Sequence, residues 1–407
     1  MKAFLEWVLL ALALLQFLHE GLPPGNADLI SVQSLAIDLS HNEPRFLYPG
    51  YGFERNDEWV AHHEANLRSV GQPKLEPNWC FYPPLIPFLL TPIAGASVNS
   101  WRMVWGVLQL LLLVAFAEVT VRLLVKSGAT PSPHRVLIYA LIFGCYPVER
   151  AVALGQTSIL IALLLWIGIY ARMLNKQIPA ALSIGFAVFV KPFLALTELV
   201  NLARRKTRVA LMSWGVVFGL LLLSIIAVGV AAHIEYWNLL RTLSTSLTAY
   251  AGNQSLLAGF LRFFSALPVM DYGFQFSPGL ALAGRFLAVI ILGVAAWAQW
   301  TSREVHALAA TGLWISASLL ALPISWEHHL LFLLPAIAYL WTARWNETGY
   351  ALLGAATLCI CLSVTALYGD TFSGRVAASV PLFGDLMVFV FLVTMHVRPR
   401  AFTRVHV

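Results

Sequence analysis

Long apolar stretches separated by short polar turns run along the whole of this 407-residue chain. A helix needs about 20 mostly apolar residues to cross the hydrocarbon core of a membrane, and most of these stretches reach or approach that length. The pattern therefore predicts an all-α, polytopic membrane protein. The predicted spans are residues 4–22, 101–125, 135–153, 156–174, 208–231, 280–300, 306–323, 327–343, 349–368 and 379–396.

A further apolar block, residues 178–203, is interrupted by Lys191-Pro192. Proline lacks a backbone donor and disfavours helix at the preceding residue, so we expect two short helices joined as a hairpin. With that hairpin, most of the 26 basic residues fall in short loops or tails on one face, which the positive-inside rule assigns to the cytoplasm. The prediction is a bundle of about twelve spans with both termini in the cytoplasm.

Two long segments, residues 23–100 and 232–279, then lie as loops on the opposite, outer face, where we expect the functional site. Residues 84–90 are apolar but too short to cross, which is typical of a helix lying at the membrane interface. No separate soluble domain fits, so residues 1–407 are expected to form a single integral membrane domain. The first span is expected to be retained, because Leu22-Pro23-Pro24-Gly25 is a poor signal-peptide cleavage site.

Apolar residues make up 59% of the chain and charged residues 11%, which fits a membrane protein. The net charge of +6 does not indicate nucleic-acid binding, because the basic residues lie at span ends and not on one amphipathic face. The four cysteines show neither a disulfide framework nor zinc-ligand spacing, and His62-His63-Glu64 lacks the second half of a metal site. The cysteines are Cys80, Cys145, Cys359 and Cys361.

Asp28 follows the first predicted span by a few residues, at the depth where a lipid headgroup would lie. A carboxylate there can accept the proton of an attacking sugar hydroxyl, which is general-base catalysis. The alternative is that Asp28 caps a helix beginning at Leu29. The other carboxylates of this loop lie deeper in polar sequence and are expected to be solvated; they are Asp38, Glu43, Glu54 and Asp57.

Two basic residues are candidates for binding a phosphate. Lys191 lies within an apolar block, where an ionisable side chain is costly unless it pairs or faces water. The alternative for Lys191 is that its chain snorkels to the interface. Arg262, in the second long loop, carries a guanidinium suited to bidentate contact with phosphate oxygens.

Other polar and aromatic residues near the outer ends of the predicted spans could line a sugar pocket. Gln156 could hydrogen-bond sugar hydroxyls or simply begin a helix, whereas Arg150 is interpreted as an ion pair with Glu149. Trp326 could stack on a sugar ring, with His328 or His329 contacting phosphate or carbohydrate, although interfacial aromatics also belt membrane proteins. The full set of pocket candidates is Tyr82, Gln156, Asn253, Gln254, Trp326, His328 and His329.

No Walker-type loop, dinucleotide fingerprint or Asp-x-Asp pair is present, which favours a lipid-phosphate sugar over a nucleotide sugar as donor.

The candidate residues and their neighbouring motifs resemble, in the same order along the chain, those of the polytopic GT-C glycosyltransferases, specifically glycosyltransferase family 87. The resemblance rests on Asp28 with Tyr48-Pro49; Phe81-Tyr82-Pro83-Pro84-Leu85; Pro147 with Gly155-Gln156; Lys191-Pro192; Asn253-Gln254-Ser255-Leu256 with Arg262; and Ser325-Trp326-Glu327-His328-His329.

The resemblance implies an inverting transfer from polyprenyl-phosphate mannose, with Asp28 as base and Lys191 and Arg262 holding the donor phosphate. The implied partners are a polyprenyl-phosphate sugar donor, a glycolipid or glycan acceptor and membrane lipid.

We expect no cofactor and no obligatory metal, although the carboxylates of the loop could bind a divalent ion. The expected location is the bacterial cytoplasmic membrane, with the site on the periplasmic face. The alternatives are a flippase or transporter of a lipid-linked saccharide, and an O-antigen-type ligase or polymerase using an Arg/His set.

Overall fold

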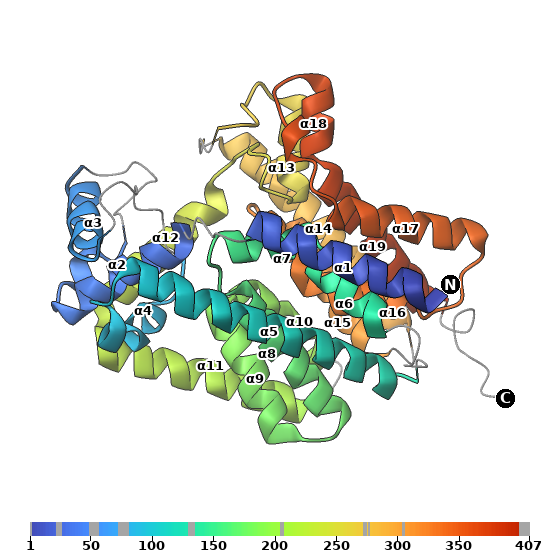
Figure 1. Cartoon of the computed structure of the whole chain (residues 1–407), viewed down its shortest axis with the longest axis horizontal. Helices are drawn as coiled ribbons and strands as arrows, with labels where there is room; N and C mark the ends of the chain where they lie inside the picture. The colour runs from blue at the N-terminus through green and yellow to red at the C-terminus, as the bar shows by residue number, and fades with distance from the viewer. Residues whose placement is uncertain are drawn as a thin grey trace.

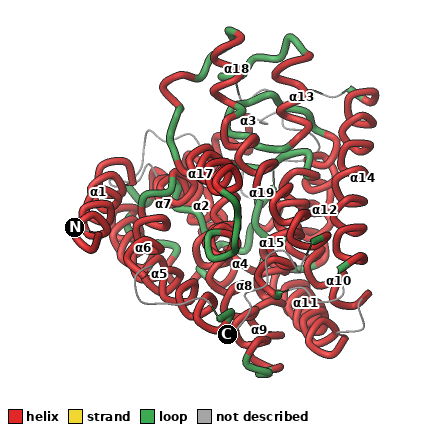
Figure 2. Tube along the Cα trace, turned by 90° about the vertical axis from the view of Figure 1, so that its right-hand side faces the viewer, coloured by secondary structure: helices red, strands yellow, loops and turns green. Residues whose placement is uncertain are grey.

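The protein is built from α-helices throughout its described length (Figure 1). The computed structural model describes residues 2–21, 27–48, 57–71, 81–128, 135–203, 207–271, 275, 277–302 and 306–398. Within these ranges there is no strand, and the only β contacts are the isolated bridges Leu247–Gln275 and Asn253–Trp326 (Figure 2). Trp79, Cys80, Pro49, Glu54 and the basic run at 204–206 lie outside the described residues.

The helices of the first half of the chain are α1 (Lys2–Gly21), α2 (Ala27–Ser40), α3 (Asp57–Ser69), α4 (Leu85–Leu89), α5 (Val98–Lys126), α6 (Arg135–Phe143), α7 (Tyr146–Ala153), α8 (Ser158–Met173), α9 (Gln177–Val190) and α10 (Ala195–Ala203). Those of the second half are α11 (Thr207–Val228), α12 (Val230–Thr245), α13 (Leu256–Phe264), α14 (Pro278–Thr301), α15 (Ala307–Ala321), α16 (Leu334–Leu340), α17 (Glu347–Cys361), α18 (Phe372–Ala378) and α19 (Val380–Val397). Short 3-10 helices are η1 (Pro44–Phe46), η2 (Thr91–Ile93), η3 (Pro192–Leu194), η4 (Glu327–Leu333) and η5 (Thr365–Leu367).

Four of the described helices are long and apolar enough to cross a membrane: α5, α11, α14 and α19. The pair α6 and α7, bent by 50°, would make a fifth if it forms one span. Large apolar side chains such as Ile226 on α11 and Val289 on α14 are exposed, as expected of surfaces that face lipid. The all-α, polytopic membrane fold is confirmed, whereas the count of about twelve spans stays a prediction, because the remaining apolar helices are shorter.

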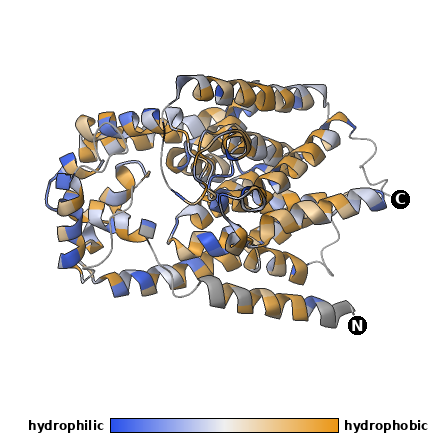
Figure 3. Cartoon of the chain, turned by 90° about the horizontal axis from the view of Figure 1, so that it is seen from above, coloured by the Kyte–Doolittle hydropathy of each residue, from blue (hydrophilic) through white to orange (hydrophobic). Residues whose placement is uncertain are grey.

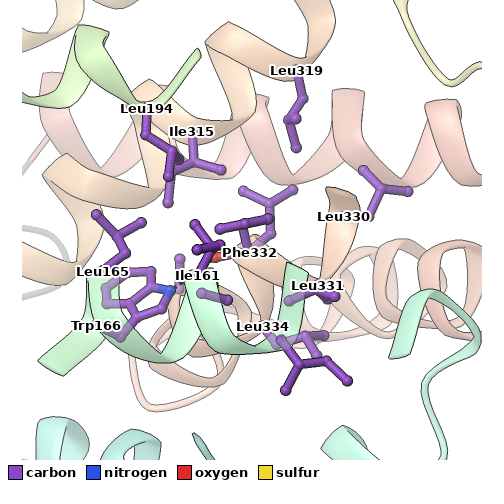
Figure 4. Packing of buried hydrophobic residues seen from close by; sticks show 14 of the residues in the cluster. Ile161, Leu165, Trp166, Leu194, Ile315, Leu319, Leu330, Leu331, Phe332 and Leu334 are labelled. Carbon is purple, nitrogen blue, oxygen red and sulfur yellow. Dashed lines mark hydrogen bonds between the residues drawn. The ribbon is translucent and has the colours of Figure 1, made fainter. Parts of the chain in front are cut away.

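The centre of the bundle is a closely packed apolar core where α8, α15 and η4 meet (Figure 4). Trp166 of α8 lies fully buried there, and its indole Nε1 donates to the carbonyl of Phe332 at 3.1 Å. The span predicted over residues 327–343 is an apolar helix from Glu327 to Leu340, shorter than a full crossing. The segment divides into η4 and α16, and Pro335 stands in the first turn of the new helix, the position that tolerates a residue without an N–H.

Small residues bring α8, α9 and α11 into close contact. A Cβ added at Gly168 would lie 2.5 Å from Ile184 Cγ1, and one added at Gly185 would lie 2.6 Å from Val216 Cβ. Close backbone approach through small residues is a general means of packing helices in membranes. These contacts fix α9, whose C-terminal end carries Lys191.

The chain leaves the helical conformation at Lys191 (φ −125°, ψ 86°), so the predicted break before Pro192 is confirmed. The chain then turns back towards the end of α8, where Arg172 donates to both carboxylate oxygens of Glu198 on α10 at 2.7 Å. This return is what a hairpin requires.

The helices of the first long loop, α2, α3 and α4, gather at one end of the molecule (Figure 1), where hydrophilic residues are frequent (Figure 3). The predicted short helix at residues 84–90 is present as α4. The N-terminal end of α1 and the C-terminal end of α19 lie at the opposite end (Figure 1, Figure 3). The side chain of Gln33 ties α2 to the start of α5 by donating to the carbonyls of Ala94 at 2.9 Å and Ala96 at 2.7 Å.

Candidate functional site

A cavity of about 280 Å³ opens among the helix ends on the side of the first long loop, close to the roughly 300 Å³ lower end of small-molecule pockets. Its walls come from α2, the segment before α4, the α7–α8 turn, the α9–η3 break, α12 and the start of η4. The structure therefore brings together segments from nearly the whole chain. Seven of the ten predicted site residues line it: Asp28, Tyr82, Gln156, Lys191, Trp326, His328 and His329.

A chain of hydrogen bonds holds the Asp28 carboxylate. Gln156 donates its amide Nε2 to Asp28 Oδ2, and Tyr82 donates its hydroxyl to Gln156 Oε1 at 2.6 Å. The backbone N–H of Asp28 donates to the carbonyl of Leu154 at 3.1 Å, which fixes the start of α2 against the end of α7. Asp28 lies within the first turn of α2, after the start of the helix, and its carboxylate points into the cavity wall.

Gln156 is itself held by hydrogen bonds from Gln109 and Tyr82. Its carbonyl accepts from Gln109 Nε2 of α5 at 3.2 Å, and the Tyr82 hydroxyl also accepts from the backbone N–H of Thr157 at 3.3 Å. Gln109 therefore holds the backbone of Gln156, and Tyr82 holds the side-chain amide that donates to Asp28. A donor fixed in this way stabilises the ionised carboxylate, the form in which it can accept a proton.

Lys191 lies at another wall of the same cavity. Its Nζ is 3.3 Å from His329 Nε2 and 5.4 Å from the centre of the Tyr82 ring. Since the ammonium can only donate, His329 Nε2 accepts, and the proton of the neutral ring is assigned to Nδ1. Phe193, just after Pro192, packs its ring 5.2 Å from that of His329 and limits its movement.

The two histidines point into the site from a 3-10 helix. Successive residues of such a helix differ by about 120° in direction, and the rings lie 4.6 Å apart at 77°. His328 Nε2 and His329 Nδ1 are buried and have no hydrogen-bond partner among the described residues. Buried polar atoms of this kind generally meet a ligand or water. Trp326 packs its ring against Tyr250 at 6.3 Å.

Arg150 forms its ion pair with Glu327 of η4, where the sequence had predicted Glu149. Its Nε donates to Glu327 Oε1 at 2.7 Å, and the Arg150 side chain is 37% exposed. Adjacent residues of a helix point in different directions, which is why Glu149 is turned away into the bundle. Arg150 is therefore a second cation at the cavity wall.

Arg262, predicted to contact the donor phosphate, does not line the cavity, and its phosphate contact stays a prediction. The side chain is 0% exposed, and its guanidinium donates to the carbonyls of Ala249, Tyr250, Ala251 and Asn253. Burial lowers its pKa to about 10, and the surrounding carbonyls serve as its acceptors. Arg262 holds the loop that carries Tyr250 and Gly252 to the cavity.

Asn253 and Gln254 are likewise structural in this geometry, since neither lines the cavity. Asn253 Oδ1 accepts from the backbone N–H of Ser325 at 2.8 Å, and its Nδ2 donates to the carbonyl of Pro323 at 3.1 Å. Gln254 donates to the carbonyl of Ala378 at 3.1 Å. The Asn253 side chain binds the loop to the segment preceding Trp326, which places Trp326 at the cavity.

Of the carboxylates weighed as a base, Asp28 lines the cavity and the described alternatives do not. Asp38 was expected to be solvated, but it is fully buried between α2 and α3, and burial raises its pKa to about 6. Glu43 and Asp57 are at least partly exposed elsewhere on the first loop.

Sequence reasoning missed the wall contributed by α12. Tyr236, Leu240, Leu243 and Ser244 line the cavity, and Tyr236 packs its ring 5.4 Å from that of Tyr48. Their spacing of four, seven and eight residues marks one face of a helix, and this pattern could have revealed them. The sequence interpretation assigns residues 232–279 to an outer loop, whereas Val230–Thr245 form a helix.

A family model described as glycosyltransferase family 87 matches residues 79–323. The chain belongs to glycosyltransferase family 87. This family 87 match includes Tyr82, Gln156 and Lys191, while Asp28 and the histidine pair lie outside the matched range.

A similar protein is the polyprenol-phosphate-mannose-dependent alpha-(1-2)-phosphatidylinositol mannoside mannosyltransferase of Mycobacterium tuberculosis, 27% identical over 286 residues.

That alignment covers 67% of this family 87 chain and 64% of the relative, so the chain matches somewhat less than two thirds of the relative's length. No solved structure matches the chain significantly.

Proposed function

We propose that this protein is a membrane glycosyltransferase that moves mannose from a polyprenyl-phosphate donor to a glycolipid or glycan acceptor, with inversion at the anomeric carbon. The observation that carries the proposal is the placement of Asp28 and Lys191 at one cavity, with Gln156 and Tyr82 orienting the carboxylate. A base and a cation at one pocket are what an acceptor hydroxyl and a donor phosphate require.

In the proposed step, Asp28 takes the proton of the acceptor hydroxyl as that oxygen attacks the anomeric carbon. The bond between that carbon and the phosphate oxygen breaks, and polyprenyl phosphate leaves. Lys191 and Arg150 stabilise the negative charge that develops on the departing phosphate, which is electrostatic catalysis by groups already in place. His328 and His329 contact the sugar or the phosphate, and Trp326 stacks on the sugar ring. The step requires no cofactor, and no metal ion is invoked in it.

The identity of the sugar rests on the family and on the mycobacterial relative, whose printed name specifies a polyprenol-phosphate-mannose dependence. That name also supports a glycolipid as the acceptor class. The apolar fraction of the cavity wall, including Leu240, Leu243 and Leu322, suits the first isoprene units of a lipid tail.

We place the protein in the bacterial cytoplasmic membrane, with both termini cytoplasmic and the cavity at the periplasmic face. The distribution of basic residues supports this orientation, as does the separation of the first loop from the terminal ends of α1 and α19 (Figure 3). Flippase or transporter activity is disfavoured, because the long loops gather on one face and no repeat is evident in the sequence.

The test is transfer of radiolabelled mannose from synthetic polyprenyl-phosphate mannose into membrane lipids by wild-type protein and by Asp28→Asn. General-base removal costs about 10²–10⁴-fold in rate, so the variant is expected to lose transfer while keeping its melting temperature. Asp57→Asn is the matched control, since Asp57 stands in the first turn of α3 and away from the cavity.

Unchanged transfer in Asp28→Asn would remove Asp28 from the mechanism. Absence of transfer in the well-folded wild-type protein would remove mannose as the donor sugar, and assays with other polyprenyl-phosphate sugars and a lipid-linked saccharide flipping assay would then decide between another donor and transport.

A further inference from the structure

A compact group of metal-type ligands lies in the first long loop, outside the cavity. Asp38 near the end of α2, Glu43 just before η1 and His62 of α3 place a ligand atom each within 4.8 Å of one another. His62 Nε2 is 2.7 Å from Asp38 Oδ1 and 3.6 Å from Glu43 Oε2. None of the three lines the cavity. In the sequence, His62-His63 has no further metal ligands nearby. The fold brings Asp38 and Glu43 next to His62.

Asp38 Oδ2 is an independent indication that a cation belongs here. Asp38 is 0% exposed, and its Oδ2 is buried with no hydrogen-bond donor among the described residues. The nearest ring nitrogen, His63 Nδ1 at 3.6 Å, already accepts from the Ser34 hydroxyl at 2.6 Å, since His63 Nε2 donates to the carbonyl of Phe46 at 2.9 Å. That neutral ring has no proton to offer Oδ2. A buried carboxylate oxygen without a donor is costly unless a cation compensates it.

We propose that Asp38, Glu43 and His62 bind a divalent transition-metal ion. One imidazole nitrogen and two carboxylates suit Zn²⁺ or Mn²⁺ and cancel the double charge. Ligands at about 2.0–2.2 Å from a tetrahedral ion lie about 3.3 Å apart. His62 Nε2 would therefore move away from Asp38 Oδ1, now at 2.7 Å, by about 0.6 Å and towards Glu43 Oε2, now at 3.6 Å, by about 0.3 Å, while the Asp38 and Glu43 ligand atoms already lie within 4.8 Å of each other. Glu43 is partly exposed, which leaves an entry path and a position for water.

The groups around the site already orient the ligands. Asn66 Nδ2 donates to Asp38 Oδ1 at 2.6 Å, and the His62 ring stacks on Phe46 at 3.8 Å and 14°. Partners of this kind fix ligand orientation in metal sites. Binding would displace the proton on His62 Nε2 that now points at Asp38, so the ion replaces the hydrogen bond between the two side chains.

The ion would join three segments of the first loop: α2, the turn leading to η1, and α3. Because α2 also carries Asp28 in its first turn, the ion would stiffen the helix that positions the candidate base. Tyr48, two residues after η1, donates to the carbonyl of Tyr82 at 2.8 Å and so links the same region to the cavity wall. The role is structural, and it stands or falls independently of the proposed transfer.

The experiment uses the purified full-length protein, stripped with a chelator and then titrated separately with Zn²⁺ and Mn²⁺. Bound metal is counted by elemental mass spectrometry after gel filtration, and the melting temperature is followed in parallel. Wild-type protein is expected to retain about one ion per chain and to melt at a higher temperature when loaded. Glu43→Gln and His62→Gln are expected to bind at least about tenfold more weakly.

Glu64→Gln is the matched control, because Glu64 lies on the same helix two residues after His62 and pairs with Arg68 at the surface. It should bind metal as the wild type does. Glu43→Gln changes a partly exposed side chain and keeps the test valid even if His62→Gln folds poorly. Equal metal content in wild type, Glu43→Gln and a folded His62→Gln, or no retained metal in the wild type, would overturn the proposal and leave a plain Asp38–His62 hydrogen bond.

Discussion

Tyr82, Gln156 and Asp28 show how individual polar side chains acquire a role only through their partners. Gln156 alone could be an ordinary residue at a helix start, but its amide donates to Asp28 and accepts from Tyr82. Arg262 shows the reverse, because a side chain suited to phosphate is satisfied by backbone carbonyls. Two predictions at the scale of residues separate these roles.

Tyr82→Phe should lower the turnover number about tenfold, because loss of the hydroxyl leaves Gln156 Oε1 without its donor and loosens the amide that holds Asp28. Steady-state transfer kinetics check this, with little change expected in the Michaelis constant for the donor. Tyr350→Phe is the control, since that hydroxyl donates to the carbonyl of Ala343, away from the cavity. Equal turnover in both variants would mean that the Tyr82 hydroxyl plays no part.

Arg262→Met should lower thermal stability, by about 3 kcal/mol or more, because several buried carbonyls lose a charged donor together. Thermal unfolding of the purified variant measures this. Arg241→Met on the exposed side of α12 removes the same charge and should be nearly neutral. A stable Arg262→Met protein whose only defect is a raised Michaelis constant for the donor would instead support the predicted phosphate contact.

At the scale of elements, the position of Lys191 depends on how α9 is packed. The break before Pro192 ends α9 at the cavity, and Gly168 and Gly185 allow α9 to lie close to α8 and α11. A helix held by such contacts cannot shift without moving the lysine. A different contact brings Trp326 and the histidines to the cavity, because the start of η4 is bound to the loop around Asn253.

Gly185→Ala tests that packing. The added methyl would lie 2.6 Å from Val216 Cβ and 2.7 Å from the carbonyl oxygen of Ser213, so α9 and α11 must separate. We expect a loss of about 1–3 kcal/mol, seen as a lower melting temperature, together with reduced transfer. Gly215→Ala on α11 meets nothing within 4 Å and should be neutral or slightly stabilising. Equal stability of the two variants would contradict the close α9–α11 contact.

At the scale of the whole molecule, the polar first loop and the far end of the bundle are separated by the length of the long helices. Gln33 fixes α2 to the start of α5, and α5 has 29 residues, which corresponds to about 43 Å. The two ends of α5 therefore lie far enough apart to face opposite sides of a membrane.

Labelling from each side of the membrane tests this arrangement and its orientation. In a background with the four cysteines replaced by serine, Ala65→Cys on α3 and Lys126→Cys at the end of α5 are treated with a membrane-impermeant maleimide. In intact spheroplasts Ala65→Cys should react and Lys126→Cys should not, and lysis should expose the second. Reaction of Lys126→Cys alone in intact spheroplasts would reverse the orientation, and reaction of both would contradict the separation.

The apolar and polar pattern by itself determined that this chain is an all-α membrane protein, because hydrocarbon admits only long apolar helices whose backbone bonds are internal. It also located the break at Lys191-Pro192, because proline acts on its immediate neighbours. Asp28 could be singled out by its place just after the first apolar span, and Lys191 because an ionisable residue inside an apolar block is costly. Those effects are local in sequence.

Only the tertiary structure decided which polar residues meet. Gln156 and Asp28 are 128 residues apart, and Lys191 and His329 are 138 apart, so their contacts depend on the packing of many helices. The same packing turned Arg262 inward onto carbonyls and buried Asp38 beside His62. A side chain's chemistry can be read from its residue type, but its partners are set by distances that arise only when the helices pack together.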